Sequence, residues 1–243
     1  MDAAYVPIQV SGETFADFAN SLRGGSLGGL NVTIPFKEEA LAVADHTDEA
    51  ARTAGAANVL LFGADGSIEA RNTDGLGLLA AFAEQAPSLD LRSGPVVILG
   101  AGGAARGAAA ALVGAGAPEV RFVNRTLSRA TALADRFGGR AYALDRAGEA
   151  FDSCNVIINA TPAGVTGAAV GWPLDAAPAD AGVMDMVYRP VLTPLLAQAA
   201  ARGMPIVDGL AMLIHQAAPS FQAFFRETPP PLDARALLLK AIG

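Results

Sequence analysis

Short apolar runs alternate with alanine-rich stretches across residues 92–208. Pro95–Leu99 reads PVVIL, a β-branched run typical of a strand buried on both faces. The alternation predicts a parallel, doubly wound α/β sheet. The predicted strands are Pro95–Leu99, Val120–Asn124, Asn155–Asn159, Val183–Met186 and Pro205–Val207. The predicted helices are Gly103–Val113, one after Thr126 as N-cap, and 193–202 with Pro194 in its first turn.

The rest of the chain predicts a second α/β unit. Gly63–Gly66 separates the segments 58–62 and 67–71 as in a hairpin, and Leu76–Gln85 predicts a connecting helix. Two more helices are predicted at Leu210–Arg226 and Asp233–Ile242. We therefore expect two domains. One consists of residues 1–75 and 209–243, with the C-terminal helices packing back on it, and the other of residues 76–208.

Composition narrows the class of protein. The net charge of −7 comes without a basic stripe, which disfavours nucleic-acid binding. No glycine-free apolar run approaches the ~20 residues of a membrane helix. Cys154 is the only cysteine, so an internal disulfide is impossible and a cytoplasmic location is expected. With only two histidines besides, no metal site is expected. Monomer and homodimer both stay open.

A glycine-rich turn follows the PVVIL strand. Residues 100–105 read GAGGAA and match G-x-G-x-x-G/A, with Ala105 in the last place. Such a turn lets a pyrophosphate approach the backbone N–H groups at the start of a helix. A glycine turn without a ligand is the structural alternative. Because a clear strand precedes it, we favour nucleotide binding by Gly100, Ala101, Gly102, Gly103 and Ala104.

The end of the next strand indicates which dinucleotide binds. An NAD site typically has an acidic residue there, but this chain has Asn124, Arg125 and Thr126, with Arg129 one helical turn later. A guanidinium can bind the adenosine 2′-phosphate, so the pattern favours NADP(H) over two ordinary surface arginines. Thr161, in the segment NATPAG, follows a third strand and is expected to line the same crevice.

Two segments before residue 76 carry candidate chemistry. NVTIPFK (31–37) brings a strand end, a proline and Lys37 together, and NTDG (72–75) brings Asp74 to the junction of the two domains. On their own, Lys37 is more often a solvated lysine and Asp74 a helix N-cap.

Taken together, the motifs closely resemble the shikimate dehydrogenase family over nearly the whole chain. The matching segments follow the family's order: NVTIPFK (31–37), GAANV (55–59), NTDG (72–75), GAGGAARG (100–107), NRTLSR (124–129), NATPAG (159–164), DMVY (185–188) and DGLAMLIHQAA (208–218). The resemblance implies a substrate domain and a Rossmann-like NADP domain. It also implies NADPH-dependent, reversible reduction of 3-dehydroshikimate to shikimate, a step of chorismate and aromatic amino-acid biosynthesis.

The resemblance also implies roles for single residues. Lys37 and Asp74 match the catalytic pair, with Lys37 as the principal acid and base. Two further groups match positions that contact ligands. Those expected to hold the substrate are Thr33, Asn58, Tyr188 and Gln216, and those expected near the cofactor are Met186, Gly209 and Glu49.

The start of the chain departs from the family pattern. Family members begin with a strand, a loop with two closely spaced serines that hold the substrate carboxylate, and a helix, whereas DAAYVPI (2–8) resembles the family's second strand. We expect roughly 20–30 preceding residues to be missing through an internal start site, leaving an exposed sheet edge and a weaker carboxylate anchor.

Three alternative functions stay open. One is a quinate or shikimate dehydrogenase, and another is a catalytically weak NADP-binding sensor or scaffold. The third, a methylenetetrahydrofolate dehydrogenase-like enzyme, is disfavoured by NVTIPFK, NTDG and DMVY together.

Overall fold

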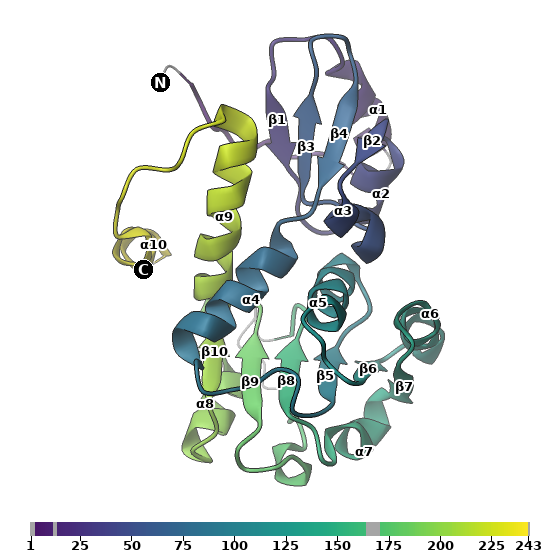
Figure 1. Cartoon of the computed structure of the whole chain (residues 1–243), viewed down its shortest axis with the longest axis vertical. Coiled ribbons are helices and arrows are strands. Elements are labelled where there is room, and N and C mark those ends of the chain that lie inside the picture. The colour runs from purple at the N-terminus through teal and green to yellow at the C-terminus, as the bar shows by residue number, and fades with distance from the viewer. Residues whose placement is uncertain (1–2, 12–13, 164–170, 243) are drawn as a thin grey trace.

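The protein folds into two lobes, each built on its own β-sheet (Figure 1). The computed structural model describes residues 3–11, 14–163 and 171–242. Gly164 of the NATPAG segment and the first two residues lie outside this part of the chain. Among the described helices, none combines the length and the apolar character needed to cross a membrane.

The sheet of the small lobe has the strand order β1-β3-β4-β2. Its strands are β1 (Gly29–Asn31), β2 (His46–Thr47), β3 (Val59–Phe62) and β4 (Ile68–Arg71). β3 and β4 form an antiparallel hairpin, and Ile68 and Ala70 of β4 alternate with half-exposed neighbours, as one buried face requires. This face packs against the short helices α1 (Phe15–Ser21), α2 (Lys37–Ala42) and α3 (Glu49–Ala54).

The sheet of the large lobe has the strand order β10-β9-β8-β5-β6-β7, and each neighbouring pair is parallel. The strands are β5 (Val96–Leu99), β6 (Val120–Asn124), β7 (Arg140–Ala143), β8 (Val156–Asn159), β9 (Gly182–Asp185) and β10 (Ile206–Asp208). The helices are α5 (Gly103–Gly114), α6 (Leu127–Phe137), α7 (Ala147–Phe151) and α8 (Pro194–Ala201). Separate apolar cores on the two faces explain why the central strands are continuous hydrophobic runs.

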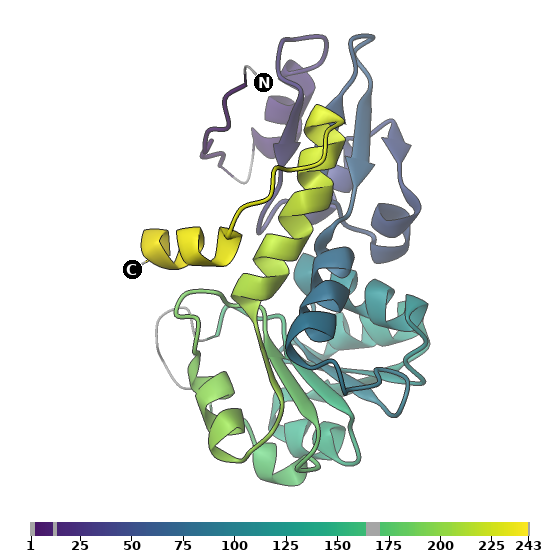
Figure 2. The ribbon, with the colours of Figure 1, turned by 60° about the vertical axis from the view of Figure 1, so that its left-hand side comes forward.

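Two long helices join the lobes. α4 (Asp74–Gln85) leaves the small sheet, and α9 (Gly209–Phe225) returns to it from β10, as Figure 2 shows. The helices cross closely, since a Cβ added at Gly77 of α4 would lie 2.7 Å from the Cβ of Gln216 in α9. At the other end of α9, the ring of Phe224 packs on Gly29 of β1. α9 therefore belongs to the packing of the small lobe although it comes last in the chain.

The final helix, α10 (Ala234–Ile242), is tied to the start of α9. Asp208 is the N-cap of α9 and accepts a hydrogen bond from the N–H of Ala211 at 2.9 Å. Its carboxylate also accepts both guanidinium N–H groups of Arg235, at 2.6 and 3.2 Å. Burial raises the pKa of Asp208, but the hydrogen bonds from Arg235, Ala211 and Gln85 outweigh burial and hold this pKa below its ordinary value.

The predicted α/β class with two sheets is confirmed, and the predicted strands and helices agree with the structure to within a few residues. One detail is wrong. In the described part of DAAYVPI, residues 3–8, there is no strand, because an extended segment becomes one only when a neighbouring backbone pairs with it. Tyr5 instead donates its hydroxyl to the side chain of Asn31 at 3.1 Å.

The predicted position of Thr126 is confirmed. It occupies the N-cap position of α6, but its side chain makes no capping hydrogen bond. The N–H of Arg129, a usual partner of such a side chain, donates to the carbonyl of Thr126 instead, at 3.1 Å.

Candidate active site

An ion pair joins the first residues of two helices at the base of the small lobe. Lys37 begins α2, directly after the strand end and proline of the NVTIPFK segment, and Asp74 begins α4. The Nζ of Lys37 lies 2.5 Å from Oδ2 of Asp74. Only 13% of the lysine side chain and 7% of the aspartate side chain are exposed. A charge pair so removed from water requires further hydrogen bonds to hold its geometry.

Asn58 supplies the first of these bonds. Its Nδ2 donates to Oδ1 of Asp74 at 3.0 Å and to Oγ1 of Thr73 at 2.9 Å. Its Oδ1 accepts the N–H of Thr73 at 2.8 Å, so both ends of the amide are used. Asn72 contributes by accepting the N–H of Asp74 at 3.0 Å. The Asp74 carboxylate is thus held with one oxygen toward Asn58 and the other toward Lys37.

α9 contributes Gln216 to the same network. The Oε1 of Gln216 lies 3.3 Å from both Nδ2 of Asn58 and Oγ1 of Thr73. Ser220, one turn further along α9, shares a hydrogen bond of 3.1 Å with Thr73. The predicted residues Lys37, Asp74, Asn58 and Gln216 are therefore brought together from separate parts of the chain.

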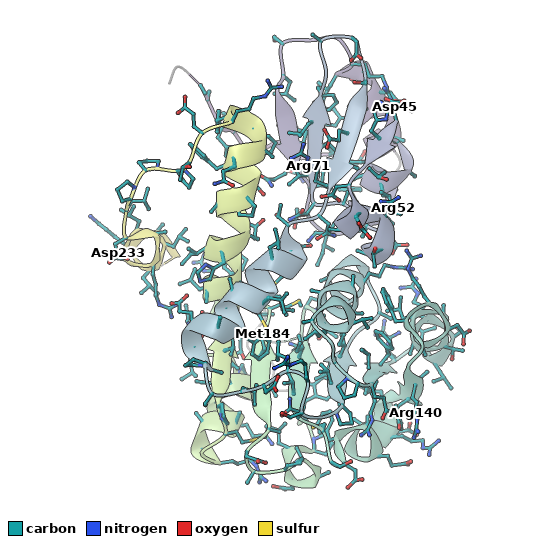
Figure 3. The ribbon with its side chains drawn as sticks, in the orientation of Figure 1. Asp45, Arg52, Arg71, Arg140, Met184 and Asp233 are labelled. Atoms are coloured by element: carbon teal, nitrogen blue, oxygen red, sulfur yellow. The ribbon has the colours of Figure 1, made fainter. Side chains whose placement is uncertain are left out.

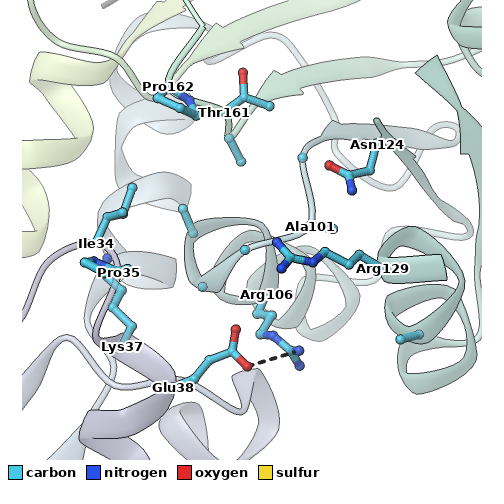
Figure 4. A pocket seen from close by; sticks show the side chains of 16 residues that line it. Ile34, Pro35, Lys37, Glu38, Ala101, Arg106, Asn124, Arg129, Thr161 and Pro162 are labelled. Carbon is cyan, nitrogen blue, oxygen red and sulfur yellow. Dashed lines mark ion pairs between the residues drawn. The ribbon is translucent and has the colours of Figure 1, made fainter. Parts of the chain in front are cut away.

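The glycine loop and Lys37 line the same cavity, of about 560 Å³ (Figure 4). The loop lies between β5 and α5, at the carboxyl end of the large sheet. Lys37, Arg106 and Arg129 bring positive charge to the wall of the cavity. The remaining lining residues are Ile34, Pro35, Glu38, Gly100, Ala101, Gly102, Gly103, Ala104, Asn124, Ala132, Ala160, Thr161 and Pro162.

Two glycines shape the loop and leave space beside its backbone. Gly100 has φ +111°, which disfavours any other residue, and a Cβ added there would lie 3.0 Å from Thr161. Gly102 faces open space, with no atom within 4 Å of an added Cβ. The Nε of Arg106 is a buried donor without a partner in the described residues. An anionic group at this helix start is compatible with these features.

A buried carboxylate, Asp185, stabilises the turn that contains Thr161 and the loop that follows β9. Asp185, at the end of β9, accepts hydrogen bonds from Asn159 at 2.9 Å, the N–H of Val187 at 3.0 Å and Thr193 at 2.6 Å. Asn159 in turn accepts the hydroxyl of Thr161 at 2.6 Å. Burial raises the pKa of Asp185, which these hydrogen bonds only partly offset. Asp185 thus fixes both the Thr161 turn and the Val187–Thr193 loop.

The other predicted site residues lie around this centre. Arg125 and Thr126 are exposed at the start of α6 and do not line the cavity. Met186 is half-buried after β9, and buried Gly209 is pressed against it, since an added Cβ would lie 2.6 Å from the Met186 carbonyl. Three further residues are exposed and also lie outside the cavity wall: Thr33, Glu49 and Tyr188.

Arg106 and Glu38 are residues of the cavity wall that sequence reasoning missed. The Nη2 of Arg106 in α5 lies 3.3 Å from Oε2 of Glu38 in α2, which links the two lobes (Figure 4). Both stand beside motif residues, Glu38 after Lys37 and Arg106 within GAGGAARG. A charged residue in or next to a motif suggests a role at the site, but the sequence does not show that these two residues form an ion pair.

A cavity with a dinucleotide-type helix start on one wall and a paired lysine on the other defines a two-lobed, dinucleotide-binding oxidoreductase. Family comparison agrees. Residues 1–60 match the "Shikimate dehydrogenase substrate binding domain", and residues 81–166 match "Shikimate / quinate 5-dehydrogenase". The chain belongs to the shikimate dehydrogenase family.

Individual relatives give the same result. The chain is 52% identical to the shikimate dehydrogenase (NADP(+)) of Caulobacter vibrioides, over 100% of this chain and 87% of the relative. Among solved structures, it resembles the shikimate 5-dehydrogenase of Thermus thermophilus in complex with NADP(H) and shikimate. That match has a TM-score of 0.82 and 36% identity, over 96% of this chain and 85% of the other. The quinate dehydrogenase of Corynebacterium glutamicum in complex with NAD matches with a TM-score of 0.84 and 30% identity, over the same shares.

Proposed function

We propose that the protein catalyses the reversible, NADP(H)-dependent interconversion of 3-dehydroshikimate and shikimate. The observation that carries the proposal is the Lys37–Asp74 pair, with Lys37 lining the same cavity as the glycine loop. Its homologues bear the name of this activity, and one solved relative holds both NADP(H) and shikimate. The product places the enzyme in chorismate and aromatic amino-acid biosynthesis.

Lys37 is the acid and base of the proposed reaction. Reduction of a ketone to an alcohol adds a hydride to carbon and a proton to oxygen. Lys37 donates that proton to the oxygen during reduction and takes it back during oxidation. Asp74 holds the Nζ of Lys37 at 2.5 Å and so restricts the movement of the ammonium. Because Asn58 anchors the other carboxylate oxygen, Asp74 cannot rotate without breaking a second hydrogen bond.

NADP(H) would supply or accept the hydride when bound. We assign its diphosphate to Gly100–Ala104 and its adenosine 2′-phosphate to Arg129, together with Asn124, Arg125 and Thr126. Arg129 lines the cavity, and no acidic residue stands at the end of β6, which supports NADP(H) over NAD. Thr161 supports the same crevice from β8. Three residues complete this proposed set on the strength of the motifs: Met186, Gly209 and Glu49.

The substrate hydroxyls and carboxylate are assigned to Asn58 and Gln216, together with Thr33 and Tyr188. Asn58 and Gln216 are supported by their hydrogen bonds to each other and to the Asp74 neighbourhood. Thr33 and Tyr188 are exposed and rest on the motifs alone. An exposed side chain can close on a ligand, so these two are expected to affect the KM for shikimate more than turnover.

The decisive experiment replaces Lys37 with alanine. NADP⁺ reduction with shikimate, followed at 340 nm, should fall by about 10²–10⁴-fold. NADPH binding, measured by fluorescence titration, should change little. The chain's only other lysine is Lys240 in α10, so Lys240→Ala is the matched control. Unchanged turnover in Lys37→Ala would refute the role of Lys37.

We also propose a cytoplasmic location and domain boundaries near residues 75 and 209. The single cysteine supports the location, and the change from one sheet to the other at α4 and α9 supports the boundaries. Analytical ultracentrifugation would decide between the monomer and homodimer expected from the sequence.

A further inference from the structure

Arg136, near the end of α6 in the large lobe, reaches across to the small lobe. Its Nη2 donates to the carbonyls of Arg52 and Thr53, both at 2.8 Å. The Nε donates to the Thr53 carbonyl at 3.2 Å. Both carbonyls belong to the last turn of α3, and Figure 3 places Arg52 at the end of the small lobe that faces the large one. Unlike Arg106 and Arg129, Arg136 does not line the cavity.

The end of α3 is well suited to receive a guanidinium. The last carbonyls of a helix lack partners within it and carry its negative dipole end, so a forked cation satisfies both needs. Gly55 is the C-cap of α3, and its φ is +68°. A Cβ added at Gly55 would lie 3.0 Å from the Cζ of Arg136. The guanidinium therefore packs directly on the glycine, and a side chain there would displace it.

The chain continues from the end of α3, which Arg136 binds, to a residue that forms a backbone hydrogen bond with Lys37. Two residues after Gly55, the N–H of Ala57 donates to the carbonyl of Lys37 at 2.7 Å. Asn58, the anchor of Asp74, comes next in the chain. Movement of the α3 end thus passes through two residues of backbone to both members of the ion pair.

The large lobe also approaches Lys37 from the other side. A Cβ added at Gly103, in the first turn of α5, would lie 3.1 Å from the Cβ of Lys37. Arg106 of the same helix pairs with Glu38, the residue after Lys37. Arg136 adds a third contact between the lobes, from α6, the helix that carries Arg129 in its first turn. Lys37 therefore lies between the backbone of Ala57 on one side and the first turn of α5 on the other.

We propose that Arg136 is a positioning residue. Its hydrogen bonds to the carbonyls of Arg52 and Thr53, called the clasp below, fix Lys37 relative to the cofactor-binding lobe. The inference rests on the proposed role of Lys37. It assigns Arg136 no contact with substrate or cofactor. Loss of the clasp lets the small lobe shift, so that fewer encounters place Lys37 at the reacting oxygen, while the cofactor site itself is unchanged.

The test compares Arg136→Gln with Arg146→Gln. Arg146 is an exposed arginine of the same lobe whose partner, Glu149, lies within that lobe, so this control removes the same charge without touching the clasp. In the ligand-free protein, hydrogen exchange of the peptide containing Ala57 should speed up about threefold to tenfold in Arg136→Gln alone. The kcat should fall by a similar factor, and the Kd for NADPH should stay within about twofold of wild type.

Arg136→Lys separates charge from geometry. Lysine keeps the cation at the helix end but loses the rigid fork, so we expect it to recover less than half of the lost protection at Ala57. Full recovery would overturn the role of the fork. Exchange and kcat in Arg136→Gln equal to those of Arg146→Gln, or a loss of NADPH affinity with kcat retained, would overturn the proposal. If the wild-type protein fails to oxidise shikimate, the proposed function falls, while the exchange measurement still tests the clasp.

Discussion

The Lys37–Asp74 pair allows a quantitative prediction for folding stability that is independent of any assay for activity. The perturbations are Asp74→Asn, Lys37→Met and the double variant. Asparagine keeps the size of Asp74 and an oxygen for the hydrogen bond from Asn58, but it puts an amide N–H₂ or a neutral oxygen opposite the ammonium. Methionine keeps most of the lysine stem and removes its charge.

The structure sets the magnitude of the effect. Two unit charges 2.5 Å apart attract by about 6–7 kcal/mol at an effective dielectric constant of ~20, before the penalty for removing them from water. Removing one partner of a fully buried pair costs about 3–5 kcal/mol. Lys37 retains 13% exposure and lines an open cavity, so water reaches the orphaned ammonium. We therefore expect Asp74→Asn to reduce the free energy of unfolding by about 2–3 kcal/mol.

The double variant tests whether this loss comes from the pair. With both charges gone, no orphan remains, and the double variant should be more stable than the sum of the single losses predicts, by about 1.5–2.5 kcal/mol. Urea denaturation at pH 7 and 25 °C, followed by circular dichroism, measures all four proteins. A coupling energy below about 0.5 kcal/mol would refute the reasoning, because it would mean that the two charges are screened as on an open surface.

The remaining predictions test helix packing, acid stability and cofactor choice. Gly77→Ala should lower the free energy of unfolding by about 1–3 kcal/mol, because its Cβ would meet that of Gln216; an unchanged urea midpoint would contradict the close crossing. The pKa of Asp208 is lowered in the fold, so the stability that Asp208 contributes is present at neutral pH and is lost as the pH falls through its folded pKa. Arg235→Gln should therefore lose less stability than wild type on acidification from pH 5 to pH 3, and parallel urea midpoints for the two proteins would argue against the ion pair. Arg129→Gln should raise the KM for NADP⁺ about tenfold or more and leave the KM for shikimate within about twofold, and equal KM values for NADP⁺ would remove Arg129 from the cofactor site.

The fold of the large lobe could be predicted from the sequence because burial on both faces leaves an unmistakable pattern. Val96–Leu99 is apolar throughout and fully buried, so its strand requires no knowledge of its neighbours. β7 was missed, since Arg140–Ala143 lies at the edge of the sheet and is only partly buried. An edge strand with one neighbour needs no continuous apolar run.

The candidate site was predicted only as far as its motifs reach. Lys37 and Asp74 stand in motifs whose family resemblance suggested a pair, and the fold brings them to 2.5 Å. Nothing local marks Arg136, because its partners are backbone carbonyls more than 80 positions earlier in the chain. Backbone acceptors have no signature in side-chain sequence, so such a contact is visible only after the lobes are folded.

The path of α9 sets an order for folding during synthesis. The strands of the small lobe are synthesised before α9, yet Asn31 and Asn58 form hydrogen bonds with Ser220 and Gln216 of that helix. The strands of the large sheet are also synthesised before α9, but the core on one face of that sheet includes Ala211 and Met212 of α9. Both lobes therefore depend on α9 for complete packing. The hydrogen bonds around Asp74 can form in full only after Gln216 has been synthesised.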